Sequence, residues 1–373
     1  MSISNLPRHD WIKELTPLTD AFAVPERLIE AGPYGNGHIN ETYVLVTKGD
    51  AKGGRKRYVA QKINHRIFKN VPALMDNVRR VTAHLGKLSP RALALVPTRS
   101  GEALWQDPAG NWWRLYDFIE GAHTVDQATS EAQSCETARA FGAFQAQLAD
   151  LPGGRLHETI QNFHHTRDRF EKLRAALAAD VKGRAVEVRD ELAFAFAREA
   201  ETDVLVGFLA RGEVKERVTH NDTKINNVML DDITGRGVAV IDLDTVMPGL
   251  ALYDFGEMVR TSASSTAEDD PDPSRMHVRL PLFRQLVMGY LETAGGVLNA
   301  TERGHLGFAG KMMAYENGIR FLTDYLQGDV YFRIKQPQHN LVRCRTQFAL
   351  VRSIEAERDA MARIVAEIYG SSS

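Results

Sequence analysis

The chain has 373 residues, of which 43% are hydrophobic and 25% charged, which is ordinary for a globular protein. That length allows two lobes, each with its own core. A formal net charge of -2 argues against a broad surface for nucleic acid. The two cysteines, Cys135 and Cys344, lie far apart and form no CxxC pair, so neither a zinc site nor a disulfide framework is expected.

Hydrophobic residues form no uninterrupted run that approaches the roughly 20 residues of a membrane-spanning helix. The start of the chain also lacks the apolar run that is typical of a secretory signal. We therefore expect a cytoplasmic protein with small-molecule substrates and without nucleic-acid or membrane partners. A monomer or weak dimer is the expected assembly.

The first third of the chain predicts a sheet with a helix against it. Two β-prone runs, 42–47 and 58–63, are separated by a polar, basic stretch at 48–57 whose glycines predict a hairpin loop. Residues 71–85 have a helical pattern, and 112–118 read as a further strand.

From about residue 131 the apolar residues recur at helical spacing. Helical patterns continue at 169–179 and 190–209 and return from residue 281. Between them lie three short β-prone runs, at 218–220, 227–230 and 238–242.

The change from sheet-rich to helix-rich sequence falls near Gly121, where we expect a hinge. We therefore predict an α+β fold with a small β-rich lobe at 1–118 and a larger helical lobe at 119–373. The acidic, proline-containing stretch 268–274 is expected to be an exposed loop.

The most informative residues form an HxDxxxxN pattern followed by an apolar run that ends in DxD. Phosphoryl transfer needs a carboxylate to orient the acceptor hydroxyl and take its proton, and oxygen ligands for Mg²⁺ on the phosphates. Asp222, two residues after His220, is the candidate base. Asn227 lies on the same short loop, and Asp242 ends the apolar run. Asp244 would point the same way as Asp242 if the strand continued.

This pattern, His220-Asn-Asp222 through Asn227 with Ile241-Asp242-Leu-Asp244, resembles the catalytic and metal-binding segments of the aminoglycoside phosphotransferase and choline kinase superfamily. Members share the bilobal protein-kinase-like fold. Within that group the chain is similar to bacterial N-acetylhexosamine 1-kinases. The similar stretches are 33–40, 217–227, 241–249 with 253–256, 320–332 and 339–343.

The resemblance implies an ATP-dependent kinase that forms a sugar 1-phosphate with Mg²⁺ as its cofactor. Asp222 would be the catalytic base, in agreement with the reading from the residues alone. Asn227 and Asp242 would hold Mg²⁺, with Asp244 as a candidate further ligand.

Glycines mark the predicted turn between the early strands. Gly35 and Gly37 would let the backbone approach the nucleotide phosphates, although a plain turn uses the same residues. His38 follows this turn, and the resemblance implies that it lies at the sugar.

The strand 58–63 carries Gln61 and Lys62 at the place of the superfamily's phosphate-contacting lysine. Strand alternation lets only one of them face the nucleotide, and the resemblance favours Gln61. Tyr116 and Phe118 belong to the segment that resembles the adenine-lining hinge, which would contact the base through its backbone.

Arg320 and Tyr331 lie on either side of a predicted helix end at Gly328. The resemblance implies that both contact the sugar and its N-acetyl group, and Asp329 between them is a further candidate. An ordinary ion pair between Glu316 and Arg320, four residues apart, is the structural alternative.

Two other functions remain open from the sequence. A kinase of the same superfamily could act on choline, homoserine or an aminoglycoside, but an arginine aimed at the acceptor would repel such cations. A non-catalytic kinase-fold binding module is the second alternative, and the full set of Asp222, Asn227 and Asp242 argues against it.

Overall fold

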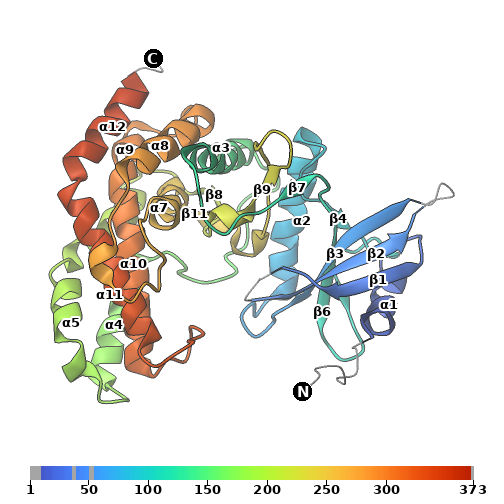
Figure 1. Cartoon of the computed structure of the whole chain (residues 1–373), viewed down its shortest axis with the longest axis horizontal. Helices are drawn as coiled ribbons and strands as arrows, with labels where there is room; N and C mark the ends of the chain where they lie inside the picture. The colour runs from blue at the N-terminus through green and yellow to red at the C-terminus, as the bar shows by residue number, and fades with distance from the viewer. Residues whose placement is uncertain (1–9, 36–38, 50–53, 371–373) are drawn as a thin grey trace, which may run out of the picture. The chain divides into compact units, whose positions relative to one another are not determined.

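The computed structural model describes residues 10–35, 39–49 and 54–370. The chain divides into two compact units, Met1–Gly121 and Ala122–Ser373 (Figure 1). The first is built around a sheet and the second is mostly helical, which confirms the predicted α+β, protein-kinase-like fold. Gly121, the last residue of the first unit, has a φ of 66°.

The first unit contains an antiparallel sheet with the strand order β1-β2-β3-β6-β4, and β5 pairs with β6. Helix α1 (Trp11–Ala21) packs on the face that carries Tyr43, Tyr58 and Leu115. Helix α2 (Val71–Leu88) begins at an Asn70 N-cap. The strands are β1 (Leu28–Pro33), β2 (Glu41–Lys48), β3 (Arg55–Ile63), β4 (Leu95–Val96), β5 (Trp105–Gln106) and β6 (Trp112–Asp117).

The predicted hairpin loop at 48–57 is too long. Strand β2 continues to Lys48 and β3 already begins at Arg55, because these two residues pair in register. Lys48 and Arg55 are exposed, so long charged side chains can occupy these strand positions and keep their charges in water. Polarity alone therefore predicted strand ends that are too early for β2 and too late for β3.

In the second unit, the 22-residue helix α10 packs against α4, α7 and α11. Helix α3 packs against α8. The helices are α3 (Glu131–Gln147), α4 (Thr166–Ala179), α5 (Arg189–Phe196), α6 (Val204–Ala210), α7 (Ala251–Ser262), α8 (Leu280–Ala294), α9 (Ala300–Gly304), α10 (Leu306–Gln327), α11 (His339–Ala356) and α12 (Arg358–Gly370). No helix in the described part of the chain is both long and apolar enough to cross a membrane.

The helical pattern predicted over 190–209 is interrupted. A 3₁₀ helix, Glu199–Asp203, separates α5 from α6. The Thr202 hydroxyl donates to the carbonyl of Glu199 at 2.6 Å, one of the local side-chain bonds that compete with a continuous α-helix.

Two small sheets carry the predicted HxDxxxxN segment. Strand β8 (Arg217–Thr219) pairs with β11 (Met247–Gly249). Strand β9 (Val228–Asp231) lies between β7 (Ala122–His123) and β10 (Gly237–Val240). The loop 220–227 therefore joins β8 to β9, and the segment 241–246 joins β10 to β11.

Candidate active site

His220 joins the two segments of the candidate site. Its Nε2 atom donates to the carbonyl of Ile241 at 2.9 Å, and its Nδ1 atom accepts the N–H of Asp222 at 3.3 Å. The rings of Phe141 and Phe144 meet the imidazole edge-on. Burial lowers the pKa of His220, so the ring is neutral and acts as a brace between the segments.

Asp254, on the first turn of α7, holds the start of the loop. Its carboxylate accepts the backbone N–H of His220 at 2.9 Å and that of Asn221 at 2.7 Å, and its carbonyl accepts the Thr223 hydroxyl. Burial raises the pKa of Asp254 to about 7, although the two N–H groups act in the opposite direction. Asp254 was not among the predicted site residues, because its partners lie more than 30 residues away in the sequence.

Asn221 occupies the left-handed region of backbone conformation, with a φ of 62°. Its side-chain amide donates to the carbonyl of Thr245, and its oxygen accepts the Thr219 hydroxyl. A Cβ atom at Gly249 would lie 2.3 Å from the Thr219 hydroxyl and 2.9 Å from the Asn221 oxygen. The strained residue before the candidate base is thus fixed from several sides, a condition typical of functional sites.

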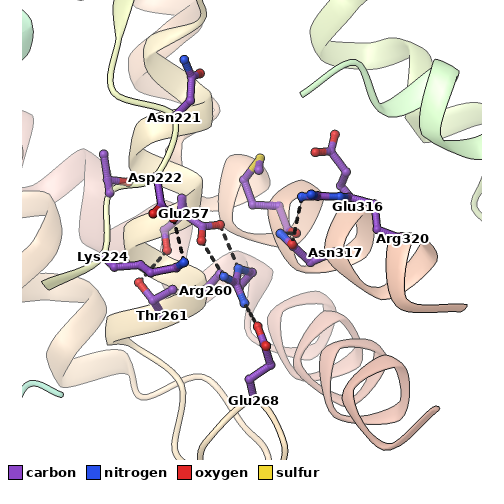
Figure 2. Close-up of polar contacts among 12 residues, drawn as sticks. Asn221, Asp222, Lys224, Glu257, Arg260, Thr261, Glu268, Glu316, Asn317 and Arg320 are labelled. Atoms are coloured by element: carbon purple, nitrogen blue, oxygen red, sulfur yellow. Dashed lines mark hydrogen bonds and ion pairs between the residues drawn. The ribbon is translucent and has the colours of Figure 1, made fainter. Parts of the chain in front are cut away.

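Asp222 lies within this braced loop with its side chain 27% exposed. Lys224 Nζ is 2.8 Å from Asp222 Oδ1 (Figure 2). Asn227 Nδ2 donates to Asp222 Oδ2 at 3.3 Å. Burial alone would raise the pKa of Asp222, but the Lys224 ammonium outweighs it and lowers this pKa below its ordinary value. The carboxylate is therefore ionised at neutral pH, as a proton acceptor must be.

A chain of buried charges continues behind Lys224 on α7. Arg260 Nε donates to Glu257 at 2.8 Å, and Arg260 Nη1 donates to Glu268 at 2.6 Å (Figure 2). The charges of Asp222 and Glu257 raise the pKa of Lys224. The stretch 268–274, predicted to be an exposed loop, is thus half-buried at its acidic end, because Glu268 is paired with a buried guanidinium.

Asp242 and Asp244 do not share one face, contrary to the expectation from strand alternation. Strand β10 ends at Val240, and Asp242 has a φ of 59° that turns the chain into the 3₁₀ helix Leu243–Thr245. Asp242 is exposed, whereas Asp244 is 3% exposed. The prediction for Asp244 required the strand to continue past Asp242. The left-handed conformation of Asp242 turns the chain instead, so the prediction is wrong.

Within the described ranges, no group of three or more His, Cys, Asp or Glu side chains is arranged to hold a metal ion. Mg²⁺ in kinases takes one or two protein oxygens together with substrate phosphates, so a complete protein cage is not required. Asn227 Nδ2 faces two oxygens of Asp222, which leaves Asn227 Oδ1 directed elsewhere with no partner in the described structure. This amide oxygen and the exposed Asp242 carboxylate have the right chemistry for a Mg²⁺ ligand pair.

Arg320 lies on α10, with its guanidinium over the rings of Phe163 and Phe332 at 5.5 Å each. Its Nη1 atom donates to Asn317 Oδ1 at 3.3 Å (Figure 2). The alternative ion pair with Glu316 does not form. Glu316 instead accepts bonds from His164 Nδ1 and the Thr166 hydroxyl, both at 2.7 Å.

Tyr331 lies in the segment that follows α10, with 65% of its surface exposed. Gly328 caps α10 in the left-handed conformation, as predicted. Asp324 then holds the segment, because its carboxylate accepts the N–H groups of Val330, Tyr331 and Phe332 at 2.8 to 2.9 Å. Asp324 was not among the predicted site residues. The only signal for it in the sequence is its position as an acidic residue one turn before the glycine cap.

Asp329, predicted to contact substrate, has a protein partner for each carboxylate oxygen. Arg184 Nη1 lies 2.7 Å from Oδ2, and Asn340 Nδ2 donates to Oδ1 at 2.9 Å. Its side chain is 6% exposed. This geometry gives Asp329 a structural role, and the predicted role at the substrate has no support from it.

Gln61 and Lys62 lie on opposite faces of the first unit's sheet. Gln61 Oε1 accepts from Arg114 Nε at 2.9 Å and from Arg114 Nη2 at 2.7 Å, and Gln61 Nε2 donates to the Thr42 hydroxyl. Arg114 is completely buried and also meets the sulfur of Met75 on α2. Lys62 pairs with Glu41 at 3.3 Å on the other face.

The remaining predicted nucleotide residues contribute little side-chain chemistry. Tyr116 is buried, with the Arg114 guanidinium 5.3 Å from its ring centre, and the ring of Phe118 is covered by Arg57. Gly35 has a φ of 75°, which favours glycine. Gly37 and His38 lie outside the described residues.

The chain matches the model of one known protein family over most of its length. The model of the phosphotransferase enzyme family matches residues 30–286, which include the braced loop and the segment around Asp242. The chain belongs to this phosphotransferase family.

Solved structures of phosphotransferases and kinases share its fold. One is an aminoglycoside phosphotransferase from Alicyclobacillus acidocaldarius, with 14% identity over 98% of this chain and 99% of that chain and a TM-score of 0.57. A microcompartment-associated aminopropanol kinase has 15% identity, coverage of 95% and 99%, and a TM-score of 0.56. A spectinomycin phosphotransferase, solved with ADP and spectinomycin, has 11% identity, coverage of 96% and 98%, and a TM-score of 0.53.

Proposed function

We propose that this phosphotransferase is an ATP-dependent kinase that phosphorylates the anomeric hydroxyl of an N-acetylhexosamine and yields the sugar 1-phosphate. The observation that carries the kinase part is the ionised Asp222, which lies beside Lys224 in a loop braced by Asp254. Family membership and the ADP bound to a relative of the same fold support ATP as the donor.

In the proposed reaction Asp222 orients the acceptor hydroxyl and accepts its proton. Lys224 keeps this carboxylate ionised, and its ammonium places positive charge beside the reacting group. Asn227 and Asp242 would hold Mg²⁺, which neutralises charge on the phosphates when it is bound with the nucleotide. Asp244 is less suited to this role because it is buried.

The acceptor part of the proposal depends on Arg320, Tyr331 and His38, the residues that resemble those of N-acetylhexosamine 1-kinases. In support, Arg320 carries N–H donors that no carboxylate occupies in the described structure, and a sugar's carbonyl and hydroxyl oxygens need such donors. The named acceptors of two relatives, aminopropanol and aminoglycosides, favour an amine-bearing acceptor as the second candidate.

A release assay for ADP separates these candidates. The enzyme would be given Mg·ATP with N-acetylglucosamine, N-acetylgalactosamine, choline or kanamycin in turn. We expect turnover with one or both N-acetylhexosamines and little with the two cations. Turnover with choline or kanamycin alone would replace the proposed acceptor and keep the kinase, whereas no turnover with any acceptor would count against both parts.

The assignment of Gln61 to the nucleotide is tested by Gln61→Glu. The new carboxylate can still accept both bonds from buried Arg114, but it loses the N–H donor and adds negative charge toward the phosphates. A hydrogen bond to a charged group contributes about 1.5–3 kcal/mol, so ADP and ATP should bind at least about tenfold more weakly by calorimetry. Lys62→Met, on the opposite face, is the matched control and should leave affinity unchanged. Equal nucleotide affinity in Gln61→Glu and wild type would remove Gln61 from the nucleotide site.

A further inference from the structure

Two arginines from neighbouring helices both contact Phe163, Arg169 through its carbonyl and Arg320 over its ring. Arg169 lies on α4 and Arg320 on α10, and these helices pack together. Arg169 Nε and Nη2 both donate to the carbonyl of Phe163, at 3.2 and 2.7 Å. Arg320 uses one nitrogen, on Asn317. The other N–H donors of both guanidinium groups have no protein partner in the described ranges.

In the described structure no carboxylate makes a hydrogen bond or ion pair with either arginine of this pair. Glu316 is close enough to influence both arginines electrostatically, but its two oxygens are occupied by His164 and Thr166. Burial and the charge of Arg320 together lower the pKa of Arg169. Two positive charges that share only the one nearby carboxylate, and make no direct bond to it, still repel each other, and an oxygen-bearing ligand bound to their open N–H groups would relieve this.

A neighbour of the pair, His164, is hydrogen-bonded to the catalytic loop. His164, which follows Phe163, makes a 2.9 Å hydrogen bond from Nε2 to the carbonyl of Asn221, the residue before the candidate base. The other ring nitrogen of His164 bonds Glu316, one helical turn before Arg320. Figure 2 shows Glu316 and Arg320 together on α10 in the same view as Asp222.

Aromatic rings give this position the character of a binding site. Phe163 and Phe332 lie against the Arg320 guanidinium, and Tyr331 lies edge-on to Phe332 at 4.8 Å between ring centres. Planar guanidinium groups between rings are held in fixed orientations, so their free N–H groups point in defined directions.

We propose that Arg169 and Arg320 form one acceptor subsite that binds a carbonyl or carboxylate oxygen and rejects acceptors carrying an ammonium group, with Arg169 as the specificity-determining residue. This inference rests on the proposed function. It also separates the chain from relatives whose named acceptors carry amines, because the doubled positive charge disfavours such a group by like-charge repulsion.

The test compares N-acetylglucosamine with glucosamine at a pH where the free amine is protonated, since these sugars differ only at that nitrogen. Wild type should bind and phosphorylate the acetylated sugar with a much higher kcat/KM. Arg169→Gln, which can still donate to the Phe163 carbonyl, should raise KM for N-acetylglucosamine about tenfold with little change in kcat, the effect of losing one charge-assisted hydrogen bond. It should also reduce the preference over glucosamine.

Two further variants keep the result interpretable. Arg169→Lys retains the positive charge but lacks the paired N–H donors of the guanidinium group. It should still reject glucosamine, while N-acetylglucosamine should bind several-fold more weakly by calorimetry. Arg174→Gln removes a different α4 arginine, one paired with Glu199 and Glu171, and should behave as wild type. Thermal unfolding of each variant reports on folding.

Equal use of glucosamine and N-acetylglucosamine by wild type would overturn the inference. So would an unchanged preference in Arg169→Gln, or, if that variant does not fold, an unchanged N-acetylglucosamine affinity in Arg169→Lys. In each of these cases sugar phosphorylation itself persists. Failure of the proposed function would look different, because wild type would then phosphorylate neither sugar.

Discussion

Asp222→Asn should lower kcat by about 10²–10⁴-fold, the range found when a positioned general base is removed. Asparagine has nearly the same size and can still accept the bond from Asn227, but it cannot take the acceptor's proton. It also removes the negative charge that lies 2.8 Å from the Lys224 ammonium, although the charge of Glu257 remains. Steady-state kinetics with Mg·ATP and the preferred acceptor would measure the loss.

A matched substitution shows whether the loss is chemical. Asp232→Asn changes an exposed aspartate of the same unit, which bonds His123 rather than the catalytic loop, and should retain wild-type kcat. Nucleotide affinity in Asp222→Asn should remain close to wild type, because the change is at the proton acceptor. Full activity in Asp222→Asn would exclude Asp222 as the base.

Asp254→Asn should lower kcat by about 100-fold, since displacement of a catalytic group by about 1 Å has effects of that size. The asparagine oxygen can accept one of the two backbone N–H groups, whereas its NH₂ group would face the other. One buried N–H of the catalytic loop would then lack an acceptor, at a cost of about 1–3 kcal/mol in the free energy of unfolding. Kinetics and chemical denaturation would measure the two effects.

Asp324→Asn provides the comparison, because Asp324 is also a buried carboxylate that accepts backbone N–H groups. We expect similar destabilisation there, but a higher KM for the acceptor and a smaller change in kcat, because Asp324 holds the segment containing Tyr331. If both variants lowered kcat equally, the effect of Asp254→Asn would reflect general destabilisation rather than loss of loop position.

The bounds of predicted helices and strands were accurate where hydrophobic residues recur regularly along a short stretch of sequence. Helix α2 was predicted at 71–85 and runs from Val71 to Leu88, and β6 was predicted at 112–118 and runs from Trp112 to Asp117. Errors came from backbone states that composition does not reveal. The left-handed Asp242 is the clearest, because its φ of 59° turns the chain into a 3₁₀ helix after β10 has ended at Val240, and Asp242 and Asp244 then lie on different faces.

The sequence predicted only those site residues that lie close together along the chain. Asp222 and Asn227 lie five residues apart, and the structure brings their side chains together. The groups that hold the loop come from distant positions, such as His164 with Glu316, and one sequence does not reveal those pairings. Likewise, the partner of Gln61 became clear only from the strand register that places Arg114 opposite it.

The central claim is phosphoryl transfer from ATP to the anomeric oxygen, and product NMR tests it most directly. Enzyme, Mg·ATP and N-acetylglucosamine or N-acetylgalactosamine would be incubated, and the sugar product examined by ¹H and ³¹P spectra. The account predicts one ADP per sugar phosphate and an anomeric proton coupled to phosphorus. A phosphate on any other hydroxyl, or ADP formed without a sugar phosphate, would contradict it.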